Sequence, residues 1–213
     1  MKNLTVIRMG LVPYEEAWNF QRDMHAKRLA GEINDTLILL EHPPVYTLGK
    51  NAGDENLIDP GDAEVIQSDR GGDITWHGPG QLVGYPIFNL EDHQKSVSWY
   101  MRSLEDTIIK TLQKFAIDSE RIRGLTGVWV GDKKVCAMGV RLSRWVTMHG
   151  FALNVRPKMS YFNGMIPCGI QGKGVTSLKE LLNKDIEISA VTPFLIDAFS
   201  SIFGFDQIEE RAD

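Results

Sequence analysis

The chain lacks any apolar run approaching the roughly 20 residues that a membrane-spanning helix needs. Its N-terminal residues 1–8 also contain no apolar run long enough for a secretion signal. Only two cysteines occur, Cys136 and Cys168, and they allow at most one disulfide. Without a secretion signal, free thiols in a reducing compartment are the expectation. We therefore predict a cytoplasmic protein with no membrane anchor.

Metal-binding patterns and an excess of positive charge are missing as well. The two cysteines and five scattered histidines show no ligand spacing for zinc, so no metal is expected. A net charge of -5 argues against nucleic acid or an anionic membrane surface as the main partner. This charge still allows a local basic patch that a small acidic partner protein could use.

The composition that is present is ordinary for a globular protein, with 43% hydrophobic and 24% charged residues. No internal repeat, low-complexity tract or linker divides the chain, so residues 1–213 are predicted to form a single α+β domain. The apolar patterns predict helices over residues 13–30, 97–115, 177–182 and 192–203. They predict strands over residues 4–9, 36–41, 64–68, 81–88, 127–131, 134–142 and 144–155, with another strand ending at residue 49.

Some local details sharpen these expectations. Pro86 suggests that its strand lies at a sheet edge or carries a bulge. Ser96 or Ser98 can cap the amphipathic helix that follows, on which we expect no chemistry. His42 beside two prolines is read as a turn residue, with a functional role as the alternative. The last helix is expected to start at Thr192 and Pro193, a cap followed by a proline.

One stretch has the composition of a binding loop: Arg70-Gly-Gly-Asp-Ile-Thr-Trp-His-Gly-Pro-Gly-Gln81. It is too rich in glycine for a helix and too polar for a buried strand. The ordinary interpretation is a surface turn between two strands. Arg70, His77 and the apolar run from Leu82 favour a second interpretation, a loop that lines a pocket with one polar and one apolar end.

A possible nucleophile lies in the long loop over residues 156–176. Cys168 sits between a proline and a glycine there, and a cysteine needs a group that lowers its thiol pKa to act as a nucleophile. Lys134 is the candidate partner, although an exposed lysine at a strand end is the ordinary alternative. Strand alternation places Lys134, Cys136 and Met138 on one face, so spacing alone does not choose between the two cysteines.

A third candidate region is His149-Gly-Phe-Ala-Leu-Asn154, at an expected strand break. The structural interpretation is a β-bulge whose polar groups are satisfied. The functional interpretation is a set of backbone N–H groups that bind an oxyanion.

Four motifs occur in a fixed order: Arg70-Gly-Gly-x-x-Thr-x-His-Gly-Pro-Gly-Gln81, Lys134-Val-x-Ala-x-Gly-Val140, His149-Gly-x-Ala-Leu-Asn154 and Ile166-Pro-Cys-Gly-Ile170. Together they resemble the lipoyl(octanoyl) transferase family. The resemblance implies one α+β domain, a mixed β-sheet packed with helices, as in biotin and lipoate protein ligases. It also implies that Cys168 carries the acyl group, that Lys134 activates it, and that Cys136 has a packing role.

The resemblance further implies a reaction and its partners. An octanoyl or lipoyl group would move from acyl carrier protein to a lysine of a lipoyl domain, in 2-oxoacid dehydrogenase complexes or in the glycine cleavage H protein. Thioester energy would drive the transfer, so no ATP, metal or other cofactor is expected, and a monomer is expected. The implied substrate-binding residues are Arg70, Gly71, Gly72, Asp73, Ile74, Thr75, Trp76, His77, Ala137, Met138, Gly139, Gly150, Phe151 and Ala152.

Finer expectations concern the acyl group itself. Trp76, Met138 and Phe151 are predicted to form walls of an apolar slot, and backbone N–H groups near Gly72 and Gly169 are predicted to hold the oxyanion.

Two other functions remain open. An ATP-dependent lipoate or biotin protein ligase would need ATP and no catalytic cysteine. A non-catalytic module would bind acyl carrier protein or lipoyl domains without transferring an acyl group.

Overall fold

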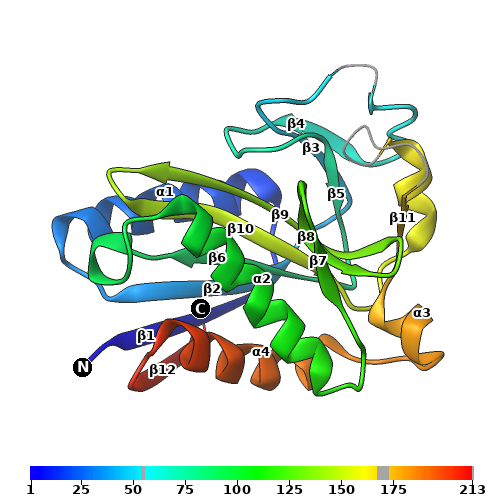
Figure 1. The fold of residues 1–213 in the computed structure, drawn as a ribbon. Coiled ribbons are helices and arrows are strands. Elements are labelled where there is room, and N and C mark those ends of the chain that lie inside the picture. Colours follow the sequence, from blue (N-terminus) through cyan, green and yellow to red (C-terminus); the bar gives the residue numbers. More distant parts are fainter. Residues whose placement is uncertain (54–55, 167–172, 213) are drawn as a thin grey trace.

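The computed structural model describes residues 1–53, 56–166 and 173–212. Its main feature is a mixed sheet whose strands follow the order β12-β1-β2-β6-β10-β9-β8-β7, with β11 paired to β9 (Figure 1). Strand β1 is parallel to β2 and β12, whereas the path from β2 to β7 is antiparallel. The strands are β1 (Asn3–Leu11), β2 (Asp35–Glu41), β6 (Gln81–Ile87), β7 (Glu120–Ile122), β8 (Leu125–Val130), β9 (Lys133–Ser143), β10 (Val146–Asn154), β11 (Gly174–Val175) and β12 (Gln207–Ala212).

Helices cover both faces of this sheet (Figure 1). Helix α1 (Tyr14–Ala30) packs on one face, against β6 and β10. Helices α2 (Val97–Gln113) and α4 (Ile188–Phe203) pack on each other and on the opposite face. The short elements are η2 (Leu90–Asp92), η3 (Met159–Gly164) and α3 (Leu178–Leu182). The predicted mixed sheet packed with helices is therefore confirmed.

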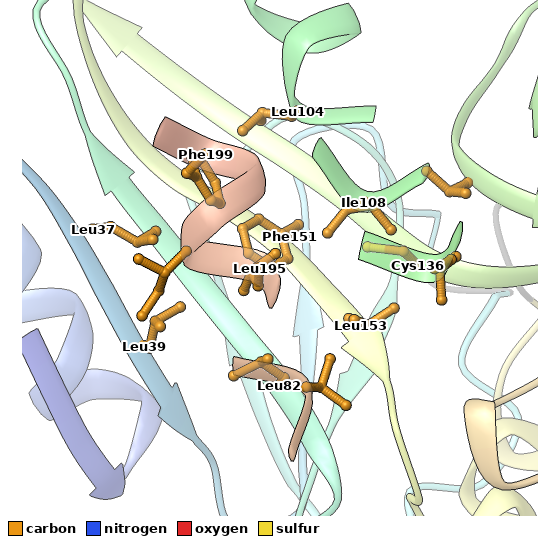
Figure 2. Close-up of a cluster of buried hydrophobic side chains, with 14 of the residues drawn as sticks. Leu37, Leu39, Leu82, Leu104, Ile108, Cys136, Phe151, Leu153, Leu195 and Phe199 are labelled. Carbon is orange, nitrogen blue, oxygen red and sulfur yellow. The ribbon is translucent and has the colours of Figure 1, made fainter. Parts of the chain in front are cut away.

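Strand β2 shows why its apolar run forms a buried strand. Leu37 and Leu39 join the core under α2 and α4, while Ile38 and Leu40 join the core under α1. Successive side chains of a strand point to opposite faces, so a strand covered on both faces needs an uninterrupted apolar sequence. Figure 2 shows the first of these cores, in which Leu37 and Leu39 pack near Leu195 and Phe199 of α4.

A smaller sheet of three strands in the order β4-β3-β5 lies beside the main sheet. Its strands are β3 (Val45–Leu48), β4 (Glu64–Gln67) and β5 (Thr75–His77). Strand β5 lies inside the glycine-rich stretch, in which no buried strand was expected. That expectation is wrong because Thr75, Trp76 and His77 pair with β3 and bury the Trp76 ring completely.

The predicted edge position of Pro86 is wrong, because β6 lies between β2 and β10. The β6–β10 pairing covers only Gln81 to Gly84, so the missing N–H of Pro86 interrupts no bond there. Beyond this point the Thr147 side chain supplements the backbone bond from the Thr147 N–H to the Phe88 carbonyl at 3.0 Å. Its hydroxyl donates to the Pro86 carbonyl at 2.7 Å and accepts from the Phe88 N–H at 2.9 Å.

Several predicted element ends are confirmed, and the start of the last helix is wrong. Gly31 ends α1 in the left-handed conformation, and Ser96 rather than Ser98 caps α2. Helix α4 begins at Ile188, five residues before Pro193. The turn before the proline contains Val191, which is completely buried, and burial of this apolar surface offsets part of the cost of the helical hydrogen bond that proline removes.

Candidate functional site

A cavity of about 540 Å³ lies against β9 and β10 and is lined on another side by the glycine-rich loop. Its lining contains Lys134 and nearly all the substrate-binding residues that the sequence predicted. These come from three separate segments: Arg70, Gly71, Gly72, Asp73, Ile74, Thr75 and His77; Ala137, Met138 and Gly139; and Gly150, Phe151 and Ala152. The β9–β10 pairing explains the last two groups, because Gly139 lies opposite Gly150 and Met138 opposite Phe151.

Trp76 is the predicted substrate-binding residue that lies elsewhere. Its fully buried ring stacks on Tyr161 with centroids 4.9 Å apart and meets the edge of Phe162 at 5.2 Å. Any side chain at Gly78 would also collide with this ring, since a Cβ would lie 2.1 Å from it. The expectation that Trp76 forms a wall of the acyl slot is therefore wrong, because the ring packs in the core beneath the small sheet.

Arg70 holds the glycine-rich loop against β3. Its guanidinium donates to the Thr47 carbonyl at 2.5 Å and to the Thr47 hydroxyl at 2.9 and 3.1 Å. It also donates to the Gly71 carbonyl at 3.1 Å, and the side chain is buried. A planar guanidinium with five donors suits this role because it can bind several acceptors in fixed directions.

Glycines let the loop backbone approach β9 and β3 more closely than any side chain would allow. A Cβ at Gly139 would lie 2.7 Å from the Gly71 carbonyl oxygen, and one at Gly49 would lie 2.3 Å from that of Gly72. The Gly71 N–H donates to the Val140 carbonyl at 3.0 Å, which joins the loop to β9. Gly72 has a φ of +88°, which disfavours a side chain.

Lys134 lies at the start of β9 and is buried, with 8% exposure. Its ammonium lies 4.8 Å from the centroid of the Trp129 ring, on the neighbouring strand β8. On its other side, β11 pairs in parallel with β9, so that Val175 lies opposite Lys134. The lysine is thus an interior group of the cavity wall, and the alternative of an exposed strand-end lysine is wrong.

Of the two cysteines, the structure describes only Cys136. Cys136 is completely buried in the core, where Figure 2 shows it near Ile108, and its thiol donates to the Ala137 carbonyl at 3.6 Å. Burial raises the pKa of this thiol far above its ordinary value, which suppresses the thiolate. Cys136 therefore packs, as the resemblance implied. Cys168 lies outside the described residues, and so does Gly169, one of the predicted oxyanion donors.

The apolar part of the cavity is formed by side chains from several elements. Met138 and Phe151 line it as predicted, and Met101, Leu125 and Val140 line it too. The Phe151 ring stacks on Phe199 of α4, and Figure 2 shows it inside the main apolar core. Met101 was not expected at the site, because its helical spacing marks it only as a residue that faces the core.

A buried polar network supports the other side of the cavity. Tyr14 and Tyr85 line it, although neither has a local sequence signal, because α1 and β6 bring them there. The Tyr14 hydroxyl bonds to that of Ser68 at 2.8 Å, and the Tyr85 hydroxyl donates to His42 Nε2 at 2.7 Å. His42 Nδ1 donates to the Val12 carbonyl at 2.6 Å, so His42 is a structural residue.

The two buried histidines of this network are held in the neutral form. Burial lowers the pKa of His42 to about 4. Burial also lowers the pKa of His77 well below its ordinary value, and the nearby His42 and Arg70 add to this effect. His77 Nδ1 donates to the Gln81 side-chain oxygen at 3.1 Å, so its ring is fixed at the cavity wall. A neutral imidazole there can act as a hydrogen-bonding group without placing a charge in the cavity.

His149 adopts a φ of +56°, which is the irregularity expected within its strand. Its N–H donates to the Gln21 side-chain oxygen at 2.8 Å, and its Nε2 donates to Asp69 at 2.7 Å. Bonding to His149 lowers the pKa of Asp69, which also pairs with Arg141. The His149 N–H is therefore already bonded inside the fold. It is not one of the backbone donors to an oxyanion that the functional interpretation of this motif predicts.

The described part of the chain also bears on metal binding and on membrane insertion. No group of three or more His, Cys, Asp or Glu side chains in it is arranged to hold a metal ion. No described helix is both long and apolar enough to cross a membrane.

The chain is similar to known proteins over most of its length. The family model of the lipoyl protein ligase A/B catalytic domain matches residues 13–200. An octanoyltransferase of Gloeobacter violaceus is 46% identical over 206 residues, which cover 96% of this chain and 92% of that protein.

Solved structures share the fold at low sequence identity. A bi-partite lipoate protein ligase of Thermoplasma acidophilum matches with a TM-score of 0.77 and 15% identity, covering 100% of this chain and 88% of its own. A biotin protein ligase of Aquifex aeolicus matches with a TM-score of 0.56 and 15% identity, covering 96% of this chain and 70% of its own. The predicted fold of biotin and lipoate ligases is confirmed. The chain belongs to the lipoyl protein ligase A/B catalytic domain family and, within it, to the octanoyltransferases, which are acyltransferase enzymes.

Proposed function

We propose that residues 1–213 act as one domain and a monomer that moves an octanoyl group from acyl carrier protein to a lysine of a lipoyl domain. Lipoyl domains of 2-oxoacid dehydrogenase complexes and the glycine cleavage H protein are the proposed acceptors. The observation that supports this most is a buried lysine, Lys134, in the wall of a cavity that also has apolar walls. An acyl chain can occupy the apolar part while a cation acts on its carbonyl end. The cytoplasmic location stays a prediction.

In the proposed first half-reaction, Cys168 is the nucleophile. Its thiolate attacks the carbonyl carbon of the donor thioester and forms a tetrahedral intermediate with a negative oxygen. Backbone N–H groups near Gly72 and Gly169 are the proposed donors to that oxygen. When the intermediate collapses, the carbon–sulfur bond to the carrier breaks, and Lys134 as an ammonium gives its proton to the departing thiol. The octanoyl group is then a thioester on Cys168.

The second half-reaction returns the enzyme to its starting state. Lys134 is now neutral and accepts a proton from the amine of the acceptor lysine as that amine attacks the Cys168 thioester. Collapse of this intermediate forms the amide and releases Cys168 as a thiolate, stabilised again by the Lys134 ammonium. A thioester is a higher-energy acyl donor than an amide, so neither ATP nor a metal enters these steps.

Described residues on both sides of Cys168 support its role. Before it, the Ile166 N–H donates to the Asn56 carbonyl at 2.8 Å, which joins Ile166 to the connection between β3 and β4. After it, Gly174 pairs with Lys133, and the Thr176 N–H donates to the Lys134 carbonyl at 3.0 Å. The described residues that follow Cys168 in the chain, Gly174 to Thr176, therefore lie beside the strand position of Lys134.

The first experiment is the intact mass of the protein after incubation with octanoyl-loaded acyl carrier protein and no acceptor. We expect an octanoyl adduct that hydroxylamine removes, that persists in Cys136→Ser and that is absent in Cys168→Ala. An adduct lost in Cys136→Ser with the fold intact would contradict the assigned nucleophile. Transfer without any adduct would contradict the covalent mechanism.

The same assay separates the other two candidate functions. Acceptor labelling that depends on ATP and survives Cys168→Ala would indicate a ligase. Carrier binding without acyl transfer in both the wild type and Cys168→Ala would indicate a binding module. The 46% identity to an octanoyltransferase favours the transferase over both.

A further inference from the structure

The ammonium of Lys134 faces an aromatic ring. Lys134 Nζ lies 4.8 Å from the Trp129 ring centroid, and the two residues are direct partners in the β8–β9 ladder. A cation within about 6 Å of an indole face is attracted by the negative charge of the π system. Trp129 is 2% exposed, so this attraction acts with little screening by water.

The ring is fixed in this place by its own strand. The Trp129 indole N–H donates to the Leu125 carbonyl at 3.3 Å, within β8. The β8–β9 register shifts between Val128 and Trp129, which makes the ring depart from regular alternation. The hydrogen bond and the bulge together orient the indole toward the start of β9, where Lys134 lies.

A glycine and a buried carboxylate shape the same bulge. Gly127 has a φ of +118°, and a Cβ on it would lie 2.5 Å from the Cys136 carbonyl oxygen and 3.5 Å from Cδ and Cε of Lys134. The Gly127 N–H donates to the Glu105 carboxylate of α2 at 3.1 Å. This arrangement lets the Lys134 stem lie against backbone and leaves its end group beside the ring.

We propose that Trp129 is a positioning residue for the acyl transfer, and this rests on the proposed role of Lys134. The indole face attracts the ammonium group of Lys134 and holds it at the cavity wall, where it can stabilise the Cys168 thiolate. Its function depends on the π system and not only on the volume of the side chain. Trp129 makes this contribution through Lys134 and does not itself touch the reacting atoms.

Other charged or titratable groups reach this neighbourhood from four described elements, α2, β7, β9 and α3; on β7, Glu120 is the ladder partner of Trp129. Glu105 on α2 binds the Gly127 N–H and lies 4.0 Å from Arg121. Cys136 follows on β9, and the Lys134 charge acts on its thiol. Glu180 on α3 accepts a hydrogen bond from the Thr176 hydroxyl at 3.0 Å. Substitution of Trp129 removes none of these groups. A shift in the Cys168 thiol pKa caused by that substitution therefore reports on the Trp129 ring.

The test measures the thiolate directly. The rate of Cys168 alkylation by iodoacetamide is followed from pH 5 to pH 10 without acyl donor, and the modified peptide is identified by mass spectrometry. The variants are Lys134→Ala, Trp129→Leu, Trp129→Phe and, as a matched core truncation on the same strand, Val128→Ala. We expect Trp129→Leu to raise the Cys168 thiol pKa by about one pH unit, equivalent to about 1.4 kcal/mol. Trp129→Phe should raise it less, and Val128→Ala should leave it unchanged.

The outcomes separate this proposal from the proposed function. If Lys134→Ala leaves the alkylation profile unchanged, the pairing of Lys134 with Cys168 is wrong, and the role of Trp129 falls with it. If Lys134→Ala shifts the profile and Trp129→Leu does not, only the role of Trp129 is wrong. An equal shift in Val128→Ala would show a general packing effect and would also overturn it.

A second measurement covers the case in which Trp129→Leu does not fold. Fluorinated tryptophans preserve the shape of the ring and weaken its negative face step by step. We expect the Cys168 thiol pKa to rise with each added fluorine, and no such rise in protein that carries Trp129→Phe. A profile that does not respond to fluorination would refute the role of the π system.

Discussion

Gly139→Ala is the sharpest test of how closely the glycine-rich loop must approach β9. The new Cβ would lie 2.7 Å from the Gly71 carbonyl oxygen, whereas ordinary contact begins near 3.4 Å. Both Gly139 and the Gly71 carbonyl belong to the backbone, so no side chain can rotate to relieve the clash. The loop has to move away from β9 by about 0.7 Å, the difference between 3.4 and 2.7 Å. Gly139 is opposite Gly150 in the β9–β10 ladder, which leaves β9 little freedom to move instead.

We expect the displacement to affect both catalysis and folding. A misplacement of about 1 Å can cost roughly 100-fold in rate, so we expect kcat/KM for octanoyl transfer to fall between about 10-fold and 100-fold. Overpacking of this kind costs about 1–3 kcal/mol of unfolding free energy. The assays are octanoyl transfer to a lipoyl domain under steady-state conditions and urea unfolding of the same preparations.

Gly174→Ala is the matched control. The added Cβ would lie 3.3 Å from the flexible Lys133 side chain, which can move away. We expect unchanged transfer and unfolding free energy equal to or slightly above that of the wild type. If Gly139→Ala transfers octanoyl at the wild-type rate, the close approach of the loop to β9 does not matter to the reaction, and this reasoning is refuted.

Four further predictions follow from the site and its surroundings. Lys134→Ala should lower kcat for transfer by about 10²–10⁴-fold with little change in thermal unfolding, and a smaller loss would argue against an acid–base role. Cys136→Ser should retain transfer activity but lower the melting temperature, because a hydroxyl replaces a thiol in the apolar core. Each methylene removed from an octanoyl donor should lower kcat/KM by about fourfold, from about 0.8 kcal/mol per buried CH₂; a flat series from hexanoyl to octanoyl would exclude an apolar slot. The pKa of His42 is lowered to about 4 in the folded state, so the unfolded chain binds its proton first, and stability should be lost as the pH falls from about 6.5 through about 4. His42→Gln should flatten this part of the stability profile in urea unfolding measured at each pH, and an unchanged slope would show that His42 is not its source.

Local signals in the sequence were enough for most elements and for much of the site. Regular apolar spacing predicted α2, and the left-handed glycine at Gly31 ends α1 as expected. The short apolar run over residues 36–41 predicted a strand, and β2 is that strand, buried along nearly all its length. Motif resemblance placed three separate segments at one cavity, and all the implied substrate-binding residues except Trp76 line it.

The wrong predictions for Trp76 and Pro86 have a common physical cause. Trp76 lies between two cavity residues in the chain, but strand pairing with β3 turns its ring into the core beneath the small sheet. Pro86 has the sequence signature of an edge strand, yet β6 is a central strand, and the Thr147 hydroxyl of β10 donates to the Pro86 carbonyl where the regular β6–β10 pairing has ended. In each case a residue distant in the sequence decides the outcome, and local propensity carries no information about that partner.

The amino-acid sequence by itself determined the element types, the family and the chemical groups available for acyl transfer, because these depend on residue identity and short-range spacing. Only the tertiary structure gave the physical reason why Cys136 is excluded as a nucleophile, which is its complete burial among apolar side chains. It also decided that Lys134 lies under an indole face and that Tyr14 and Tyr85 complete the cavity. These features depend on burial and on contacts between distant strands and helices, which exist only once the sheet has formed.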